Sequence, residues 1–237
     1  MKNLILSALA LTATLAVAQS TTPMNNMSMN MDTAFVRVVH ASPDAPAVDV
    51  YVDGTRTVAG AAFKAVTPYG NVKSGRHNVV VTVAGDKSKK VLETNVTLRA
   101  GTYYTVAAIG KLSDIGLKVF TTTNLNNNKA KARLNVYHLS PGAPNVDVRA
   151  VDFNNAKVVS NLAYSNVKTA YVNPMGVNAN VLPAGGTQVV KNLSGINIAG
   201  GKSYSVFAVG VVGASGDMSF ALVPTEDRVV ADSMMAK

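Results

Sequence analysis

The sequence contains no cysteine and no tryptophan among its 237 residues, and only two glutamates, Glu93 and Glu226. Without cysteine the chain cannot form disulfides, thiolate zinc sites, iron–sulfur clusters or a cysteine nucleophile. Two glutamates argue against a hydrolase built on paired carboxylates. Charged residues make up only 15% of the chain, whereas hydrophobic residues make up 48%. This composition excludes disorder throughout and is sufficient for substantial hydrophobic cores.

The first residues have the pattern of a signal peptide. Lys2 gives a short positive start, an apolar stretch follows, and Ala16-Val17-Ala18 is a small-residue cleavage signal. We therefore expect residues 1–18 to be a signal peptide that is removed on export. The apolar stretch is shorter than the roughly 20 residues that a membrane span needs, and no second long run occurs. We expect an exported protein that does not span the membrane.

The formal net charge of +9 is spread evenly along the chain. The densest basic cluster, Lys87, Lys89 and Lys90, has no aromatic residues between its members. A run of charges usually marks a solvated surface, so we expect these lysines at an exposed hairpin tip. Export and an even distribution of charge make nucleic acid an improbable partner, and we predict that the protein does not bind it.

The chain contains an internal repeat of about one hundred residues. HASPDAPAVDV at 40–50 matches HLSPGAPNVDV at 138–148, and AGTYYTVAAIG at 100–110 matches GGKSYSVFAVG at 200–210. A period this long indicates tandem domains rather than solenoid repeats. The predicted organisation is a flexible segment rich in Met and Asn at 19–32, domains at 33–121 and 132–225, a linker at 122–131 and a tail at 226–237.

Both repeats have the pattern of short β-strands. Runs of β-branched and aromatic residues alternate with Gly- and Asp-containing turns every 8–12 residues, a spacing typical of a sandwich. The fold class is predicted to be all-β, with two tandem immunoglobulin-like β-sandwich domains after the signal peptide. In the first strand we expect His40 on the core face and Arg37 turned outward, and in the second repeat Asn135 also turned outward. Asp49 is likewise expected to point outward.

The repeated motif H-x-S-P-x-A-P-x-V-D-V resembles that of an exported bacterial family known only as a domain of unknown function, whose members often occur in tandem. The resemblance covers nearly all of residues 34–225. It implies an immunoglobulin-like sandwich in the periplasm, the cell envelope or at the cell surface of a bacterium. It implies no established activity. The second copy differs from the first in having Gly142 for Asp44 and Arg149 for Tyr51.

The prolines of the motif exclude helix and make a stiff loop between strands. The histidine at the strand end is expected to hold this loop by bonding to its backbone or to Ser42 and Ser140. A Ser-His-Asp triad of Ser42, His40 and Asp49 is the alternative. It lacks a nucleophile elbow, and a serine held before proline is poorly placed to attack.

Copper binding is a further hypothesis. The candidate ligands are His40, His77, His138, Met24, Met27, Met29 and Met31. Thioethers favour Cu(I) and imidazole suits copper generally. Copper–zinc superoxide dismutase also uses an immunoglobulin-type sandwich, so a copper-dependent dismutase is the enzymatic alternative.

Other features of the sequence oppose a shared copper site. His40 and His138 occupy equivalent positions in different repeats, and His77 lies in a turn-like SGRHN segment where exposure is expected. The leading hypothesis is therefore non-catalytic. It describes an exported protein that binds a cell-envelope or surface-layer protein, or itself as a homo-oligomer, and that has no certain cofactor.

Overall fold

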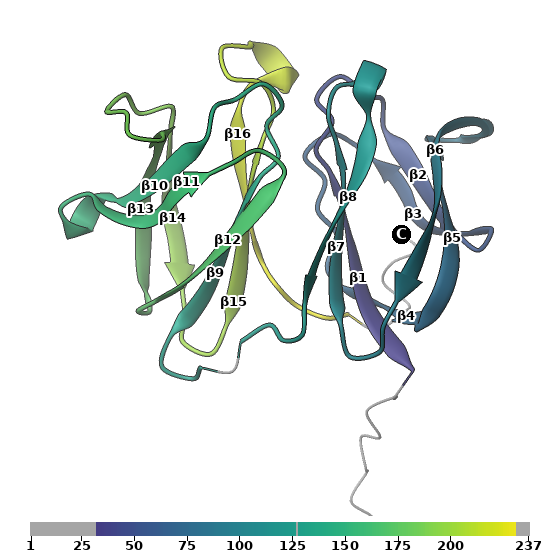
Figure 1. The fold of residues 1–237 in the computed structure, drawn as a ribbon, viewed down its shortest axis with the longest axis horizontal. Helices are drawn as coiled ribbons and strands as arrows, with labels where there is room; N and C mark the ends of the chain where they lie inside the picture. Colours follow the sequence, from purple (N-terminus) through teal and green to yellow (C-terminus); the bar gives the residue numbers. More distant parts are fainter. Residues whose placement is uncertain (1–31, 127, 231–237) are drawn as a thin grey trace, which may run out of the picture.

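The computed structural model describes residues 32–126 and 128–230, and these residues form sixteen β-strands and three short 3₁₀ segments without an α-helix (Figure 1). This confirms the predicted all-β fold class. In the described ranges there is no helix long and apolar enough to cross a membrane. The strands of the first half are β1 Thr33–His40, β2 Val48–Val52, β3 Thr55–Ala61, β4 Gly70–Lys73, β5 Gly75–Val83, β6 Asp86–Leu98, β7 Tyr103–Ile109 and β8 Gly116–Thr122. Those of the second half are β9 Ala132–His138, β10 Val146–Ala150, β11 Ala156–Leu162, β12 Asn166–Val172, β13 Met175–Pro183, β14 Lys191–Ile198, β15 Ser203–Val209 and β16 Ala221–Glu226. The 3₁₀ segments are η1 Leu112–Asp114, η2 Val151–Phe153 and η3 Gly216–Met218.

The two halves have the same strand order. In the first sandwich, sheet β4-β1-β7-β8 packs on sheet β3-β2-β5-β6. In the second sandwich, sheet β12-β9-β15-β16 packs on sheet β11-β10-β13-β14. Within each half only the two central strands of one sheet, β1 with β7 and β9 with β15, run parallel. The register is also the same, since Val36 pairs with Tyr104 and Leu134 pairs with Tyr204.

Each sandwich has an aliphatic core between its two sheets. Alternate residues of the strands point inward, as expected for half-buried strands. Val48, Val50 and Val81 belong to the core of the first sandwich. The equivalent valines of the second sandwich are joined by Leu162 and Phe220.

A third apolar cluster lies between the two sandwiches. The sheets that contain β1 and β9 face each other with their outer surfaces, so four sheets stack across the molecule (Figure 1). Val39 and Ala107 of the first sandwich pack here with Tyr137 and Phe207 of the second. The Tyr137 and Phe207 rings are stacked with their centroids 4.6 Å apart.

The expectation that Arg37 and Asn135 turn outward is wrong in one respect. Both point away from the core of their own sandwich, but Arg37 is only 1% exposed and Asn135 only 5%. They are buried because the opposing sandwich covers this face. The alternation of a strand tells which residues share a face, but it does not tell whether a second domain covers that face.

The inner and outer faces of the paired central strands differ in how well the repeats match. On the inner faces the pairs Val36–Tyr104, Val38–Val106 and His40–Ala108 recur as Leu134–Tyr204, Val136–Val206 and His138–Ala208. On the outer faces Phe35–Tyr103, Arg37–Thr105 and Val39–Ala107 correspond to Arg133–Ser203, Asn135–Ser205 and Tyr137–Phe207. The cores are thus alike, whereas the facing surfaces differ, because the aromatic pair is Phe35–Tyr103 in the first sandwich but Tyr137–Phe207, at other positions of the strands, in the second.

The segment after β16 crosses from the second sandwich to the first. Tyr69 N–H donates to the carbonyl of Arg228 over 3.0 Å, and Val230 N–H donates to the carbonyl of Tyr69 over 2.8 Å. Tyr69 lies directly before β4 and is 1% exposed. These backbone bonds add to the side-chain contacts that join the two sandwiches.

Candidate functional site

The motif histidines hold their own loops. His40 Nε2 lies 3.0 Å from the carbonyl oxygen of Pro46, and His138 Nε2 lies 2.9 Å from that of Pro144. Because a carbonyl oxygen only accepts, Nε2 carries the proton and Nδ1 carries a lone pair. The predicted bond from histidine to the loop backbone is therefore confirmed in both copies. Burial lowers the pKa of both histidines, which favours the neutral ring.

The motif serines do not bond to these histidines. Ser140 Oγ donates to the carbonyl of Gly210 over 2.5 Å. Ser42 Oγ is buried and has no hydrogen-bond partner in the described part of the chain. Among the hydrogen bonds of residues 32–126 and 128–230, none joins His40 to Ser42 or Asp49. The geometry of a Ser-His-Asp triad is therefore absent from these residues.

The motif aspartates are buried, although Asp49 points away from the core as expected, since it alternates with the core residues Val48 and Val50. Asp49 is 2% exposed and accepts hydrogen bonds from the backbone N–H groups of Gly60 and Gly85 over 2.7 and 3.1 Å. These bonds explain the burial, because a carboxylate that is satisfied by fixed N–H donors can leave water. They also hold the pKa of Asp49 below its usual value.

Asp147 makes the equivalent bonds in the second sandwich. It accepts hydrogen bonds from the N–H groups of Asn161 and Gly185 over 2.9 and 3.3 Å, and it forms an ion pair with Lys157. The N–H of Asn161 makes the largest contribution to lowering the pKa of Asp147 to about 2. The final aspartate of the motif therefore holds one irregular strand position and one hairpin turn in each sandwich.

His77 is not the exposed turn residue that was expected. It lies in β5 and is 9% exposed, with Nδ1 2.7 Å from Asp53 Oδ2 and Nε2 2.7 Å from the carbonyl oxygen of Lys73. Both ring nitrogens thus contact oxygen atoms of the protein. The His77 ring holds the pKa of Asp53 below its usual value.

The copper hypothesis stays a prediction. In residues 32–126 and 128–230 no three His, Cys, Asp or Glu side chains are grouped as metal ligands. Met24, Met27, Met29 and Met31 lie outside the described residues. His40 and His138 each have one nitrogen bonded to their own loop, and His77 has both nitrogens bonded.

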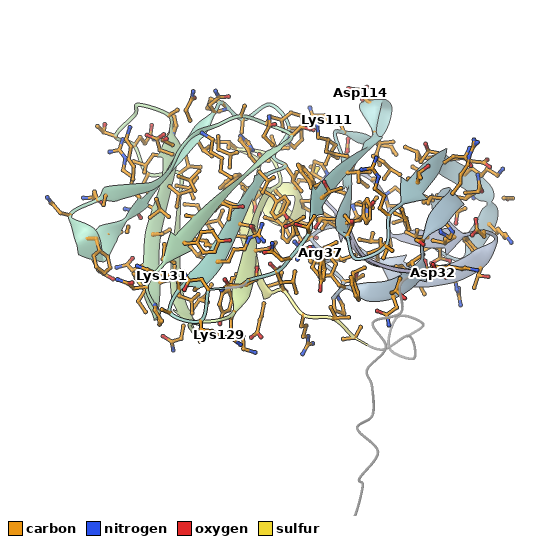
Figure 2. All side chains as sticks on the ribbon, turned by 60° about the horizontal axis from the view of Figure 1, so that its bottom comes forward. Asp32, Arg37, Lys111, Asp114, Lys129 and Lys131 are labelled. Atoms are coloured by element: carbon orange, nitrogen blue, oxygen red, sulfur yellow. The ribbon has the colours of Figure 1, made fainter. Side chains whose placement is uncertain are left out.

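The motif loops lie beside two equivalent strand connections at one end of the molecule. We call this end the tip and define it by residues 110–114 and 210–219. Figure 2 labels Lys111 and Asp114 here, and Lys129 and Lys131 at the opposite end. Each connection begins with a glycine at positive φ, +88° at Gly110 and +81° at Gly210.

A glycine is required at the start of each connection. A Cβ at Gly110 would overlap the backbone carbonyl of Asp114, and a Cβ at Gly210 would overlap that of Ser219. The positive φ is an additional reason, because other residues reach that region only with strain. The recurrence of glycine at the end of both matched segments was the signal in the sequence for these turns.

The motif supports the tip through two hydrogen bonds that differ between the copies. In the second sandwich Ser140 Oγ bonds to the carbonyl of Gly210. In the first sandwich Asp44 Oδ1 accepts a hydrogen bond from the N–H of Leu112 over 2.8 Å. Asp44 is the position at which the second copy has Gly142, so this capping bond belongs to the first copy alone.

The tip combines exposed apolar side chains with a cleft of mixed polarity between the sandwiches. Leu112 is 45% exposed, Val212 42% and Met218 44%. The cleft has a volume of about 390 Å³, and Lys111 and Asp114 are among its lining residues. Apolar and charged side chains occur together in protein interfaces.

Arg37 is at the centre of the contact between the sandwiches (Figure 2). Its Nη1 donates to Asp227 Oδ1 over 2.5 Å, its Nη2 to Ser205 Oγ over 2.8 Å, and its Nε to Thr105 Oγ1 over 2.8 Å. The guanidinium also lies 4.5 Å from the centroid of the Tyr69 ring. Arg37 therefore contacts both sandwiches and the crossing segment at once.

Asp227 is equally well satisfied. Its second oxygen accepts hydrogen bonds from Ser203 Oγ over 2.7 Å and from Asn135 Nδ2 over 3.2 Å. A buried ion pair with all its remaining positions bonded fixes a unique geometry. Sequence reasoning missed this pair because Asp227 falls in the predicted tail. The one sign of this contact in the sequence is that the two repeats have different residues, Arg37 and Asn135, at equivalent positions.

Comparison with family models finds a similarity over part of this chain. Residues 34–149 match the model of DUF4397, a domain of unknown function. This uncharacterised bacterial domain spans the first sandwich, the linker and strands β9 and β10. No curated protein matches the chain significantly.

Three solved structures are similar to parts of the chain. The C-terminal domain of AlgF from P. aeruginosa is 23% identical, with a TM-score of 0.33, and the match covers 41% of this chain and 99% of that domain. A candidate cell adhesion protein from Bacteroides eggerthii is 11% identical, with a TM-score of 0.20 and coverage of 84% and 97%. Another from Bacteroides fragilis is 12% identical, with a TM-score of 0.21 and coverage of 82% and 98%.

Proposed function

We propose that this protein is an exported β-sandwich protein of the bacterial cell envelope or surface, and that it acts by binding another envelope protein through the tip. The observation that carries the proposal is the exposure of Leu112, Val212 and Met218 on the equivalent connections of the two sandwiches. The signal-peptide pattern of residues 1–18 supports the location. The motif side chains support a binding role, because their hydrogen bonds hold loops and turns.

The contact between the sandwiches gives the tip a defined shape. Each sandwich supplies one connection, and the two are held at a fixed separation by the apolar cluster and by the Arg37–Asp227 ion pair. A surface that is already organised before binding loses less conformational entropy when a partner docks. The glycine turns and the motif bonds contribute to the same organisation.

The chemistry of the tip fits a folded protein partner. Isolated apolar side chains provide anchors for a hydrophobic patch, while Lys111 and Asp114 in the cleft provide one charge of each sign. Protein interfaces use both kinds of side chain. Nucleic acid would require a basic surface instead.

The test uses site-specific photo-crosslinking in the producing bacterium. The full chain carries a photoreactive amino acid in place of Leu112 or Val212, with Val189, which is 46% exposed outside the tip, as the matched control position. We expect one crosslinked heterologous envelope protein from the tip positions, and a loss of that product when Met218→Ser is added. Crosslinks of equal yield from position 189, or none from the tip, would overturn the proposal. A product of twice the mass of the chain would instead assign the tip to self-association.

A further inference from the structure

The second sandwich contains a larger apolar cavity than the first sandwich. The cavity lies between its two sheets and has a volume of about 270 Å³, compared with about 50 Å³ at the equivalent place in the first sandwich. Its lining residues include Leu134, Val136, Val146, Ile196, Val206 and Leu222. Because the strand orders of the two sandwiches are identical, the residues that line the two cavities can be compared position by position.

Two positions on the same strand contribute to the larger volume. Val50 pairs with Val81 and Val148 pairs with Val181, so β5 and β13 have the same register. Two residues earlier the first sandwich has Val79 where the second has Ala179. Four residues earlier the first has His77 where the second has Val177. In each case the second sandwich has the smaller side chain facing the cavity.

The cavity suits a hydrocarbon and not water. Nearly all its lining side chains are aliphatic, so a water molecule inside would lack the two to four polar partners that it needs. An engineered apolar cavity of about 150 Å³ binds benzene, which has six carbons. By the same proportion the volume here holds roughly ten carbons.

The cavity approaches solvent between two edge strands. β14 and β16 are the last strands of their sheets. Leu193 and Leu222 on these strands line the cavity and are half-buried. Glu226 also lines it, is exposed, and forms an ion pair with Lys202 at 3.0 Å. The opening thus presents one charge of each sign to the end of a ligand that remains in water.

We propose that the second sandwich binds a single alkyl chain of about ten carbons in this cavity, with the polar end of the ligand at the opening between β14 and β16. The polar end of the ligand would lie near both Lys202 and Glu226, so neither sign of charge is preferred. Recognition therefore depends on the alkyl chain of the ligand. The proposed partner-binding tip is formed by other residues, so the two proposals stand or fall separately.

The first experiment titrates the full-length protein with decan-1-ol and follows the methyl groups by NMR. Saturable shifts are expected for methyls of Val136, Ile196 and Leu222, with none for the core methyls of the first sandwich. Decanoate and decylamine should bind within a few-fold of decan-1-ol, and affinity should stop rising near ten carbons. No saturable shifts, or equal shifts in both cores, would overturn the proposal.

The second experiment fills the cavity. Ala179→Leu is expected to weaken decan-1-ol binding at least tenfold, and Ala179→Val, which introduces the residue found at the equivalent position 79, should weaken it several-fold. Val79→Ala in the first sandwich is the matched control and should leave the shifts of the second sandwich unchanged. If Ala179→Leu fails to fold, the affinity of the Ala179→Val variant for decan-1-ol tests the proposal. Unchanged affinity in a folded Ala179 variant would place the ligand elsewhere and refute the site.

A final pair of experiments distinguishes the source of the alkyl chain. The protein is titrated without decan-1-ol, once with vesicles of phosphatidylglycerol and once with free decanoate, and the same methyl groups are followed. Changes with both identify a membrane lipid as a source of the alkyl chain, whereas changes with decanoate alone identify a free amphiphile. Changes with neither would contradict binding of an alkyl chain.

Discussion

Arg37 and Asp227 form a buried ion pair between residues that are 190 positions apart in the chain, and both side chains are at most 1% exposed. The pair connects the first strand of the first sandwich to the segment that follows the last strand of the second. Its position explains why the two sandwiches form one body.

Replacing Arg37 should therefore destabilise the whole protein. Arg37→Met leaves Asp227 buried without its cation, and we expect a loss of about 3–5 kcal/mol in the free energy of unfolding. Urea denaturation measures the change. Lys89→Ala, which removes an ion pair whose lysine is 71% exposed, is the control and should leave the free energy of unfolding almost unchanged. A similar small cost for Arg37→Met would show that the pair does not hold the sandwiches together.

The motif histidines predict a loss of stability in mild acid. Burial lowers the pKa of His40 and His138, so the folded protein resists protonation that the unfolded chain accepts below about pH 6.5. The contribution of the two neutral histidines to the free energy of unfolding is therefore complete above pH 6.5, and it decreases as the pH falls toward the lowered pKa values. The slope is at most about 1.4 kcal/mol per pH unit for each histidine.

Denaturation at pH 7.5, 6.0 and 5.0 measures this slope. The variant His40→Gln/His138→Gln should be less stable at neutral pH and should lose the dependence between pH 6.5 and 5. His77→Gln serves as the comparison at a third histidine. If the double variant kept the full dependence, other groups would be responsible for it.

Asp147 should stabilise the second sandwich even at low pH. With a folded pKa of about 2, against an ordinary value near 3.9, its contribution is present above pH 3.9 and is lost only as the pH falls toward 2. Asp147→Asn should lower the free energy of unfolding by about 1–3 kcal/mol at pH 7, because two backbone donors lose a charged acceptor. The difference between the two proteins should shrink by pH 2. A constant difference from pH 7 to pH 2 would contradict the role of the charge.

Replacing a glycine at the tip should change the structure of that connection alone. Gly210→Ala places a Cβ against the Ser219 carbonyl and should displace the connection that carries Val212 and Met218. We expect altered amide chemical shifts over 210–219 and a loss of the tip crosslinks. Gly54→Ala is the control, since Gly54 has a similar φ of +81° but no atom within 4 Å of the added Cβ. Shifts that are unchanged over 210–219 would refute the role assigned to Gly210.

Copper binding is tested most directly in the segment rich in Met and Asn at 19–32. If the full chain binds Cu(I), we expect the binding to depend on Met24, Met27, Met29 and Met31 and to survive His40→Gln, because the His40 ring is committed to its loop. Elemental analysis of the protein and of a variant with all four methionines changed to leucine measures this. Binding that persists without the methionines would point to the histidines instead.

The sequence was sufficient to predict the strands and their inner faces. Val36, Val38 and His40 could be placed on the core face because strand alternation and the second repeat agree on them. Arg37 could not be placed, since its burial depends on a surface almost two hundred residues away. The cavity could not be predicted from the sequence either. The difference between Val79 and Ala179 becomes informative only when the register of β5 and β13 is known.

The contact between the sandwiches also affects folding. The first sandwich has its own core, but the outer face around Val39 and Ala107 has no cover until the second sandwich packs against it. A folding intermediate with only the first sandwich formed would therefore expose an apolar face, and exposed apolar surface makes such intermediates prone to aggregate.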